Sequence, residues 1–325
     1  MQNIMKERLL NVLRIQSESY DVTRMNEFII NQVIDMGLMP IIEKDNIYVT
    51  KGDASNYPCI VSHTDTVHKI IPDEDFTILC DESSAMGYNK HMKSASGCGG
   101  DDKVGIFICL ELLRKIDNIK VAFFRDEEVG CDGSYDADMS FFADVRFILQ
   151  CDRKGNNDFV NEIYGAQLQS KRFKKDVSKI ISLYGYHFAS GMLTDVYALN
   201  QSGVGVSVAN MSCGYYNPHC DDEVVVFDDV ENCLCMCHDI MVSMTSVYEC
   251  TYTPRKQNPV SYMSKYSSYY DWDGWSDTYP CVTDVKQEWT KCESCDELVE
   301  AKTMTYSRDF NCDVCDSCSK WMSNM

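Results

Sequence analysis

Short β-rich runs alternate with segments of helical periodicity over the first 250 residues of this 325-residue chain. Helices are predicted where apolar residues recur every three or four positions: 2–15, 23–36, 102–115, 176–184 and 230–247. Strands are predicted at the short apolar runs between them: 46–50, 59–62, 119–124, 146–150 and 204–209. This alternation predicts an α/β fold, a three-layer sandwich in which helices cover both faces of a mixed, mostly parallel sheet.

Composition excludes several classes of protein. Hydrophobic residues make up 45% of the chain and charged residues 25%, which argues against extensive disorder. No apolar run approaches the roughly 18 residues that a membrane span needs. The first 16 residues have scattered charges and lack the apolar core of a signal peptide, so we expect a cytoplasmic protein. The net charge of −20 repels phosphate backbones, so nucleic acid is not an expected partner, whereas clustered carboxylates suit cations.

Five short segments each place a metal-binding side chain at the end of an apolar run. They are SHTD at 62–65, GGDDK at 99–103, DEE at 126–128, QCD at 150–152 and NPHCDDE at 217–223. Each has a plain explanation by itself, such as an aspartate that caps a helix. Together they supply two histidines and several carboxylates, and the carboxyl ends of parallel strands share one edge of a sheet. Two imidazoles with three carboxylates suit a pair of divalent ions, most naturally zinc.

These ordered segments resemble the co-catalytic di-zinc exopeptidases, the superfamily that contains peptidase T, carboxypeptidase G, aminoacylase and related aminopeptidases. The resemblance covers roughly residues 1–250 and is closest to peptidase T in VSHTDTVH, GGDDKVG and DEEVG. It implies that His63 and Asp152 hold one zinc ion and that Glu128 and His219 hold the other. Asp101, the first aspartate of GGDDK, would bridge the two ions.

The same resemblance implies roles for three further carboxylates. Glu127 would be the general base, which takes a proton from a metal-bound water and passes it to the leaving amine. Asp65 lies two residues after His63 on the same strand face, so it can accept the second ring N–H of that histidine. Asp195, in the segment SGMLTDVYAL, would lie on the substrate side. Manganese or cobalt could replace zinc at such ligands.

One spacing differs from that of peptidase T. Peptidase T and its near relatives insert a separate domain between the last carboxylate ligand and the final histidine. Here only the 66 residues 153–218 separate Asp152 from His219. We therefore expect no inserted lid or dimerisation domain, as in the single-domain aminopeptidases.

The 18 cysteines fall into two groups with different predicted roles. Twelve lie between residues 59 and 250, mostly in apolar runs, where we expect small buried hydrophobes. Near the C-terminus, paired C-x-x-C spacing predicts a zinc ribbon with one structural zinc held by Cys292, Cys295, Cys312 and Cys315. Cys318 is an alternative ligand or a spare thiol. Nine acidic against five basic residues over 281–325 favour a protein partner or substrate docking over nucleic acid.

We therefore expect a di-zinc catalytic domain over 1–250, an aromatic-rich linker over 251–285 and a zinc-ribbon-like module over 286–325. The predicted function is that of a zinc-dependent exopeptidase, an aminopeptidase that hydrolyses short peptides. Two alternatives stay open. One is an amidohydrolase that removes the acyl group from N-acyl amino acids, and the other is a non-catalytic binding or adaptor protein with a degenerate metal site.

Overall fold

The chain divides into two compact units, Met1–Trp275 and Ser276–Met325. The structure, a computed structural model, describes residues 1–251, 289–291, 298–300, 304–307 and 312–315. The described part of the smaller unit consists of two antiparallel pairs. They are formed by β15 (Trp289–Lys291) with β16 (Leu298–Glu300) and by β17 (Met304–Ser307) with β18 (Cys312–Cys315).

The predicted zinc ribbon and linker fall mostly outside the described residues. Cys312 and Cys315 are the first and last residues of β18. Cys292, Cys295 and Cys318 lie outside the described residues, as does the predicted linker from residue 252 onward. The ribbon, its structural zinc and the three-part division of the chain therefore stay predictions.

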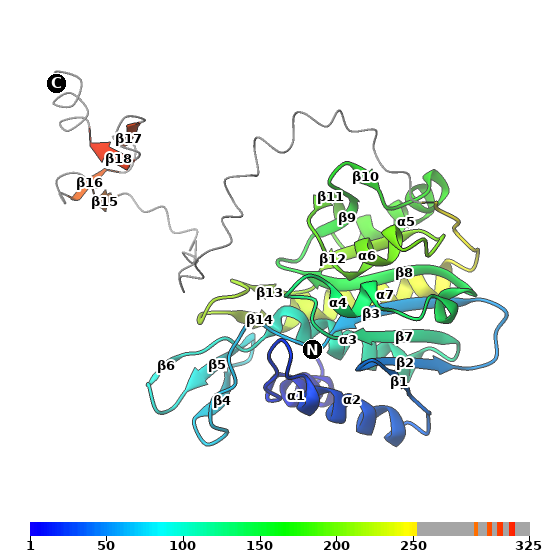
Figure 1. Cartoon of the computed structure of the whole chain (residues 1–325), viewed down its shortest axis with the longest axis horizontal. Coiled ribbons are helices and arrows are strands. Elements are labelled where there is room, and N and C mark those ends of the chain that lie inside the picture. The colour runs from blue at the N-terminus through cyan, green and yellow to red at the C-terminus, as the bar shows by residue number, and fades with distance from the viewer. Residues whose placement is uncertain (252–288, 292–297, 301–303, 308–311, 316–325) are drawn as a thin grey trace. The chain divides into compact units, whose positions relative to one another are not determined.

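A nine-stranded sheet forms the centre of the larger unit (Figure 1). Its order is β1-β2-β7-β3-β8-β12-β9-β10, with β11 beside β9. The strands are β1 (Ile41–Glu43), β2 (Asn46–Lys51), β3 (Tyr57–His63), β7 (Ile119–Phe124), β8 (Val145–Arg153), β9 (Asp158–Ile163), β10 (Ala166–Gln167), β11 (His187–Gly191) and β12 (Val208–Ser212). The central strands β7, β3, β8 and β12 run parallel, and antiparallel pairs flank them. The predicted α/β class with a mixed sheet is confirmed.

Helices cover both faces of this sheet. They are α1 (Asn3–Leu13), α2 (Thr23–Asp35), α3 (Gly100–Lys115), α4 (Asp132–Tyr135), the 3₁₀-helix η1 (Met139–Phe142), α5 (Lys171–Leu183), α6 (Asp195–Gln201) and α7 (Phe227–Ser243). One core lies between the sheet and α1, α2, α3, α5 and α7, and a second includes α6 and η1. Successive strand residues supply the two cores in turn, since Ile60 joins the first and Cys59 and Val61 the second.

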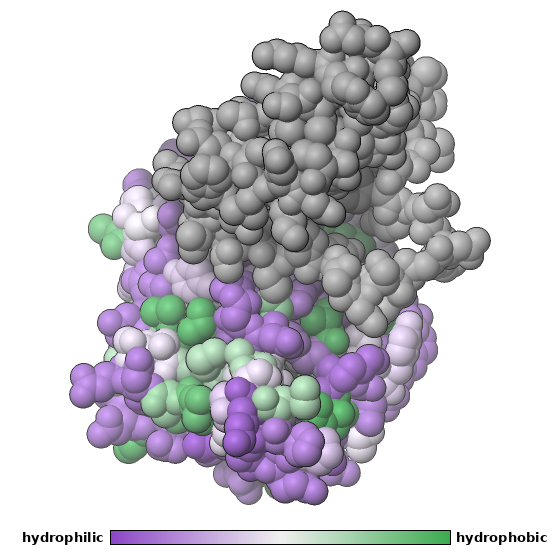
Figure 2. All heavy atoms as spheres, turned by 90° about the vertical axis from the view of Figure 1, so that its left-hand side faces the viewer, coloured by the Kyte–Doolittle hydropathy of each residue, from purple (hydrophilic) through white to green (hydrophobic). Residues whose placement is uncertain are grey.

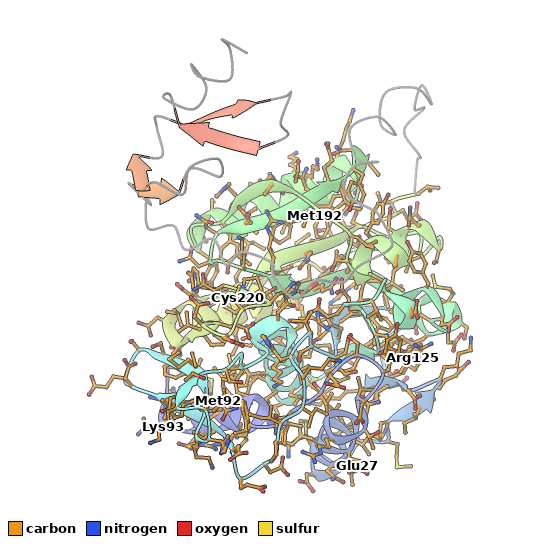
Figure 3. The ribbon with its side chains drawn as sticks, turned by 60° about the vertical axis from the view of Figure 1, so that its left-hand side comes forward. Glu27, Met92, Lys93, Arg125, Met192 and Cys220 are labelled. Atoms are coloured by element: carbon orange, nitrogen blue, oxygen red, sulfur yellow. The ribbon has the colours of Figure 1, made fainter. Side chains whose placement is uncertain are left out.

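A smaller sheet was not predicted from the sequence. It contains β4 (Phe76–Cys80), β5 (Ser84–Asn89), β6 (Ser94–Ala95), β13 (Tyr215–Tyr216) and β14 (Val224–Val226). Its strands bury few side chains, so their sequences lack the apolar alternation that marks a strand. The turn at its tip exposes Met92 and Lys93 (Figure 3). Pairing of β14 with β5 places residues 224–226, which follow the loop that carries His219, beside residues 84–86.

Some predicted ends and elements differ from the structure for local reasons. The strand predicted over 204–209 lies at 208–212, because Gly203 and Gly205 have φ of 86° and 77° and turn the chain. The helix predicted from residue 176 begins at Lys171, because the Ser170 hydroxyl accepts the Phe173 N–H at 3.2 Å and caps it. The short strands β9–β11 and the seven-residue helix α6 were missed, since each is too brief to show a period. Residues 153–218 all lie in the main sheet, its helices and their connections or in β13.

Eight of the described cysteines are buried in the larger unit, as predicted for small hydrophobes: Cys59, Cys98, Cys109, Cys131, Cys151, Cys213, Cys233 and Cys237. Three of them gather between β8 and α7, where the Cys151 Sγ lies 3.5 Å from Cys237 Sγ and 3.7 Å from Cys233 Sγ. They belong to the larger core, so their free thiols serve as packing groups.

The face shown in Figure 2 carries mostly hydrophilic side chains, with hydrophobic ones in small separate groups. Among the described helices, none combines the length and the apolar character that crossing a bilayer requires.

Replacement of Phe147 by alanine should lower the free energy of unfolding by about 3–5 kcal/mol, because it empties a buried site. Its ring lies 5.6 Å from that of Phe173 and 6.1 Å from that of Tyr248. The matched control is Phe188→Ala, since Phe188 is 37% exposed and should cost less. Urea unfolding followed by far-UV circular dichroism measures both, because all four tryptophans lie beyond residue 251. Equal losses in the two variants would contradict the assigned core.

Candidate metal centre

The predicted ligands come together at one edge of the central sheet. His63 is the last residue of β3, Glu128 follows β7, and Asp152 is near the end of β8. These three strands are parallel neighbours, so their carboxyl ends meet. Asp101 lies at the start of α3, and the small sheet supplies His219 from the loop between β13 and β14.

Two histidine–carboxylate groups share Asp101. The His63 Nε2 lies 3.2 Å from Asp101 Oδ1 and 3.6 Å from Asp152 Oδ1. The His219 Nε2 lies 3.3 Å from Asp101 Oδ2 and 3.1 Å from Glu128 Oε2. Each oxygen of Asp101 therefore faces a different histidine, as a carboxylate that bridges two ions would.

These distances suit pairs of side chains that bind the same metal ion. Two atoms that each lie about 2.1 Å from one tetrahedral zinc ion are about 3.4 Å apart. The four distances between histidine nitrogens and carboxylate oxygens run from 3.1 to 3.6 Å. The donor set, imidazole nitrogen with carboxylate oxygen, is one that zinc accepts.

The charge of the site also fits cations. Seven carboxylates gather there: Asp65, Asp101, Asp102, Glu127, Glu128, Asp152 and Asp195. Among the described residues only histidines form ion pairs with them. The buried Glu128 Oε1 has no hydrogen-bond partner within the described structure. Like charges held together under burial are costly unless a cation offsets them, so the residues present fit a pair of divalent ions.

The pKa values of the acids reflect this crowding. Burial and the neighbouring Asp101 raise the pKa of Glu128 to about 7 and that of Asp152 to about 6. Burial acts against ionisation of Asp101 too, but hydrogen bonds to His219 and His63 hold its pKa well below the ordinary value. Hydrogen bonds with Asp101 and Glu128 raise the pKa of His219 to about 11. Asp101 is therefore the most strongly anionic member of the site.

Asp65 does more than the spacing suggested. Its Oδ1 lies 3.3 Å from His63 Nδ1, and its backbone carbonyl oxygen lies closer to that nitrogen, at 3.0 Å. Its carboxylate also accepts the N–H of Glu127 at 2.9 Å and the N–H of Glu128 at 3.3 Å. Because Asp65 contacts both segments, it fixes the orientation of His63 relative to the two glutamates. Sequence reasoning missed these bonds to the glutamate backbone.

The three consecutive acids 126–128 have separate tasks. Asp126 adopts a positive φ of 54°, and its carboxylate accepts the Tyr20 N–H at 2.7 Å and pairs with Arg125 at 2.6 Å. It anchors the loop away from the ligands. Glu127 accepts a hydrogen bond from the Cys131 thiol at 3.5 Å, the sole partner of its carboxylate among the described residues. Its carboxylate therefore keeps lone pairs free near His63 and Asp152.

The two aspartates of GGDDK also divide their tasks. Asp102 accepts the Ser62 hydroxyl at 2.6 Å and the Gly105 N–H at 3.0 Å, so it caps α3 and ties the helix to β3. A Cβ at Gly105 would lie 2.3 Å from the Asp102 carboxylate, which explains the glycine. Asp101 is thus left for the histidines, and the helix-cap explanation applies to its neighbour.

Asp152 is held by residues outside the predicted ligand set. The Thr194 hydroxyl donates to Asp152 Oδ2 at 2.7 Å, and the Gln150 amide donates to the same oxygen at 3.1 Å. The Asn210 Oδ1 accepts the Asp152 N–H, and the Asn210 amide nitrogen donates to the Asp152 carbonyl oxygen. Thr194 stands beside the predicted Asp195, whereas Gln150 and Asn210 carry no local signal because ordinary strand residues surround them.

Asp195 lies behind Asp152 and has no exposed surface. Its Oδ2 accepts a hydrogen bond from Gln150 at 3.2 Å, and its Oδ1 has no partner among the described atoms. Burial raises the pKa of Asp195 to about 7. The predicted substrate-side role of Asp195 therefore remains a prediction.

No family model and no curated protein sequence matches the chain. Solved structures match its fold at low identity. The aminopeptidase PepT of Bacillus cereus has a TM-score of 0.60 at 11% identity, over 73% of this chain and 97% of that one. The aminopeptidase APDkam598 of Desulfurococcus kamchatkensis gives 0.59 at 12%, over 74% and 95%. A tripeptidase of Staphylococcus aureus gives 0.58 at 13%, over 73% and 96%.

These comparisons define the class of fold. The larger unit has the fold of the aminopeptidases and the tripeptidase named above, as the resemblance in the five segments implied. The matched segments span 95–97% of the length of those proteins and 73–74% of this chain.

In the metal-free chain, stability should fall as the pH rises from 5 to 8. Folding raises the pKa of Glu128 from 4.5 to about 7 and that of Asp152 from 3.8 to about 6. Between the pKa of each group in the unfolded chain and its pKa in the folded chain, the folded chain binds more protons. The stabilisation present at low pH is therefore lost as the pH rises through the folded-state pKa. Glu128→Gln should flatten this slope, measured as Tm by circular dichroism after chelator treatment.

Added Zn²⁺ should reverse the trend, because it binds the deprotonated ligands of the folded chain. Tm should therefore increase most at pH 8 in the unsubstituted protein and less in Glu128→Gln. An identical pH slope in the two proteins would contradict the assigned environment of Glu128.

Proposed function

We propose that this protein is a metal-dependent aminopeptidase that hydrolyses short peptides with a pair of divalent ions, zinc in the first place. The observation that carries the proposal is the pair of histidine–carboxylate groups joined through Asp101, with Glu127 beside them. His63 and Asp152 would hold one ion, Glu128 and His219 the other, and Asp101 both. Two divalent ions bound there would polarise an amide carbonyl and lower the pKa of a shared water.

Glu127 has the properties that a general base needs. Its neighbour Glu128 pairs with His219, while the Glu127 carboxylate accepts a hydrogen bond from the Cys131 thiol alone among the described groups. Burial and Asp152 raise the pKa of Glu127. A raised pKa favours a carboxyl group that takes a proton from water and holds it until the proton passes to the leaving amine. Asp65 binds the Glu127 N–H and so keeps this carboxylate at a fixed place relative to His63.

The surplus of negative charge supports cleavage at the amino end of the substrate. Seven carboxyl groups surround the site, against the four positive charges of two divalent ions, so the site is negative whenever more than four of the seven are ionised. A protonated amino terminus is attracted to such a site, and a free carboxylate is repelled from it. Asp195 contributes to this field from behind Asp152, which is the substrate-side role we assign to it.

The charge of the site and the free lone pairs of Glu127 also distinguish the aminopeptidase from the two alternatives, an amidohydrolase and a non-catalytic adaptor. An N-acyl amino acid presents a carboxylate and no amine, so the described site suits it less well. A non-catalytic adaptor would not need Glu127 to keep free lone pairs. The ribbon with its structural zinc, a protein partner for it and a cytoplasmic location complete the proposal.

The purified, zinc-loaded chain should cleave dipeptides and tripeptides with a free amino terminus and should cleave their N-acetylated forms at least about 10-fold more slowly. The physical reason is the loss of a positive charge from the substrate. A panel of free peptides, N-acetyl peptides and N-acyl amino acids, followed by product chromatography, measures this. Preference for the acylated compounds would support the amidohydrolase instead.

Glu127→Gln should reduce kcat by about 10²–10⁴-fold, because the amide cannot accept the proton. Both ions should remain bound, since Glu127 is not among their ligands, and elemental analysis measures this. The matched control is Glu162→Gln on β9, a partly exposed glutamate outside the centre, which should leave kcat unchanged. Loss of metal in Glu127→Gln would contradict its assignment as the base.

A further inference from the structure

Glu223 is a buried carboxylate that has no part in the ligand set described above. It lies four residues after His219, just before β14, and its side chain has no exposed surface. Its Oε2 accepts the Gly99 N–H at 2.6 Å, and its Oε1 accepts the Asp101 N–H at 3.1 Å. The two oxygens therefore bind two amides of the segment that carries the shared aspartate.

These amides need a partner from outside the helix. The first N–H groups of a helix have no intrahelical acceptor. Asp101 and Asp102 also depart from helical geometry, with φ/ψ of −83°/103° and −113°/34°. The carboxylate of Glu223 supplies the acceptor from 122 residues away, and its negative charge suits a helix N-terminus.

His68 and the glycines complete the enclosure of this segment. The His68 Nε2 lies 3.1 Å from Glu223 Oε2. The His68 ring also covers Gly97, where a Cβ would fall 1.8 Å from the ring. A Cβ at Gly100 would lie 2.9 Å from Tyr215 and Val225 and 3.3 Å from Glu223. Residues 97–101 are therefore packed too closely to shift unless Glu223 or His68 moves.

We propose that Glu223 is a positioning residue that holds Asp101 in the bridging position, with His68 as its brace. The inference rests on the proposed function, because bridging has meaning only for a two-ion centre. One short loop then has two tasks, since it presents His219 to the site and binds the backbone that presents Asp101. The positions of the two ligands are thereby coupled.

A carboxylate is required for this task. Its two oxygens each accept one N–H, whereas a glutamine offers one oxygen and turns an N–H₂ toward a second donor. Glu223→Gln therefore leaves one of the two amides without an acceptor at nearly unchanged volume. Partners that orient metal ligands typically matter by about 10–100-fold in metal affinity or activity.

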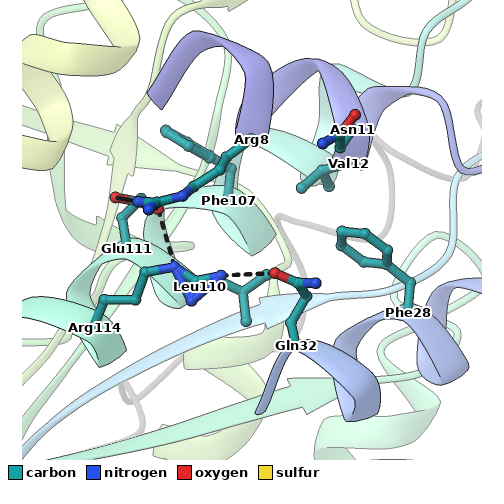
Figure 4. Close-up of a pocket in the computed structure, with 9 residues that line it drawn as sticks. All are labelled: Arg8, Asn11, Val12, Phe28, Gln32, Phe107, Leu110, Glu111 and Arg114. Atoms are coloured by element: carbon teal, nitrogen blue, oxygen red, sulfur yellow. Dashed lines mark hydrogen bonds and ion pairs between the residues drawn. The ribbon is translucent and has the colours of Figure 1, made fainter. Parts of the chain in front are cut away.

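Glu111 provides a matched control. It is also a buried glutamate, and it lies on the same helix, about 15 Å along α3 from Asp101. Its carboxylate pairs with Arg8 at 2.9 Å and Arg114 at 3.4 Å beside the pocket between α1, α2 and α3 (Figure 4). Glu111→Gln therefore loses a buried charge pair without touching residues 97–101.

The test compares the full-length protein with Glu223→Gln and Glu111→Gln. In the metal-free proteins, hydrogen exchange of residues 97–104 should be faster in Glu223→Gln alone. Mn²⁺ is the probe for binding, because carboxylates suit it and the thiolates of the C-terminal region do not. Affinity for Mn²⁺ should fall about 10–100-fold in Glu223→Gln and stay within about twofold in Glu111→Gln.

Turnover separates positioning from a structural role. Glu223→Gln should lower kcat with KM unchanged, and excess metal should restore part of the loss, whereas Glu111→Gln should keep its kcat with and without excess metal. Unchanged exchange and Mn²⁺ affinity in Glu223→Gln, or equal losses in the two variants, would overturn the proposal. A wild-type chain that binds Mn²⁺ but cleaves no peptide would refute the proposed function alone, because the exchange and affinity comparisons need no turnover.

Discussion

The site depends on one carboxylate placed between two imidazoles. Each oxygen of Asp101 faces the Nε2 of a different histidine, at 3.2 Å for His63 and 3.3 Å for His219. Its ionised form is stabilised by these contacts although burial opposes it. Glu128 and Asp152 stand at the outer side of each histidine and are crowded by the same charge. The other features of the site follow from holding these neighbouring carboxylates in place at buried positions.

The supporting contacts come from segments that are distant in the sequence. Asp65 links His63 to the backbone of Glu127 and Glu128, and Asp102 ties α3 to β3. Thr194 and Gln150 orient Asp152. Each of these contacts is a hydrogen bond to a carboxylate oxygen. A shift of any one segment would therefore move a side chain that faces the site. Such support is typical of sites that bind metal ions, where ligand orientation controls affinity.

The small sheet explains how the last histidine reaches the centre. In the sequence, residues 64–99 are a long stretch between two ligands without clear periodicity. In the structure, β5 from this stretch pairs with β14 as well as with β4 and β6, and the loop between β13 and β14 carries His219. An apolar pattern could not reveal this sheet, because most of its side chains are only partly buried. The pairing of strands more than 100 residues apart is a tertiary event.

The sequence by itself determined the α/β class and the central strands and indicated the candidate ligands, because buried parallel strands are apolar throughout and end in the polar groups of the site. Only the tertiary structure decided which carboxylates face the histidines. In the folded chain Asp126 anchors a loop and Asp102 caps a helix. Glu127 has few partners, and Glu223 accepts the backbone N–H of Asp101. The reason is that adjacent acids are alike in composition, and their tasks follow from the donors that folding brings to each oxygen.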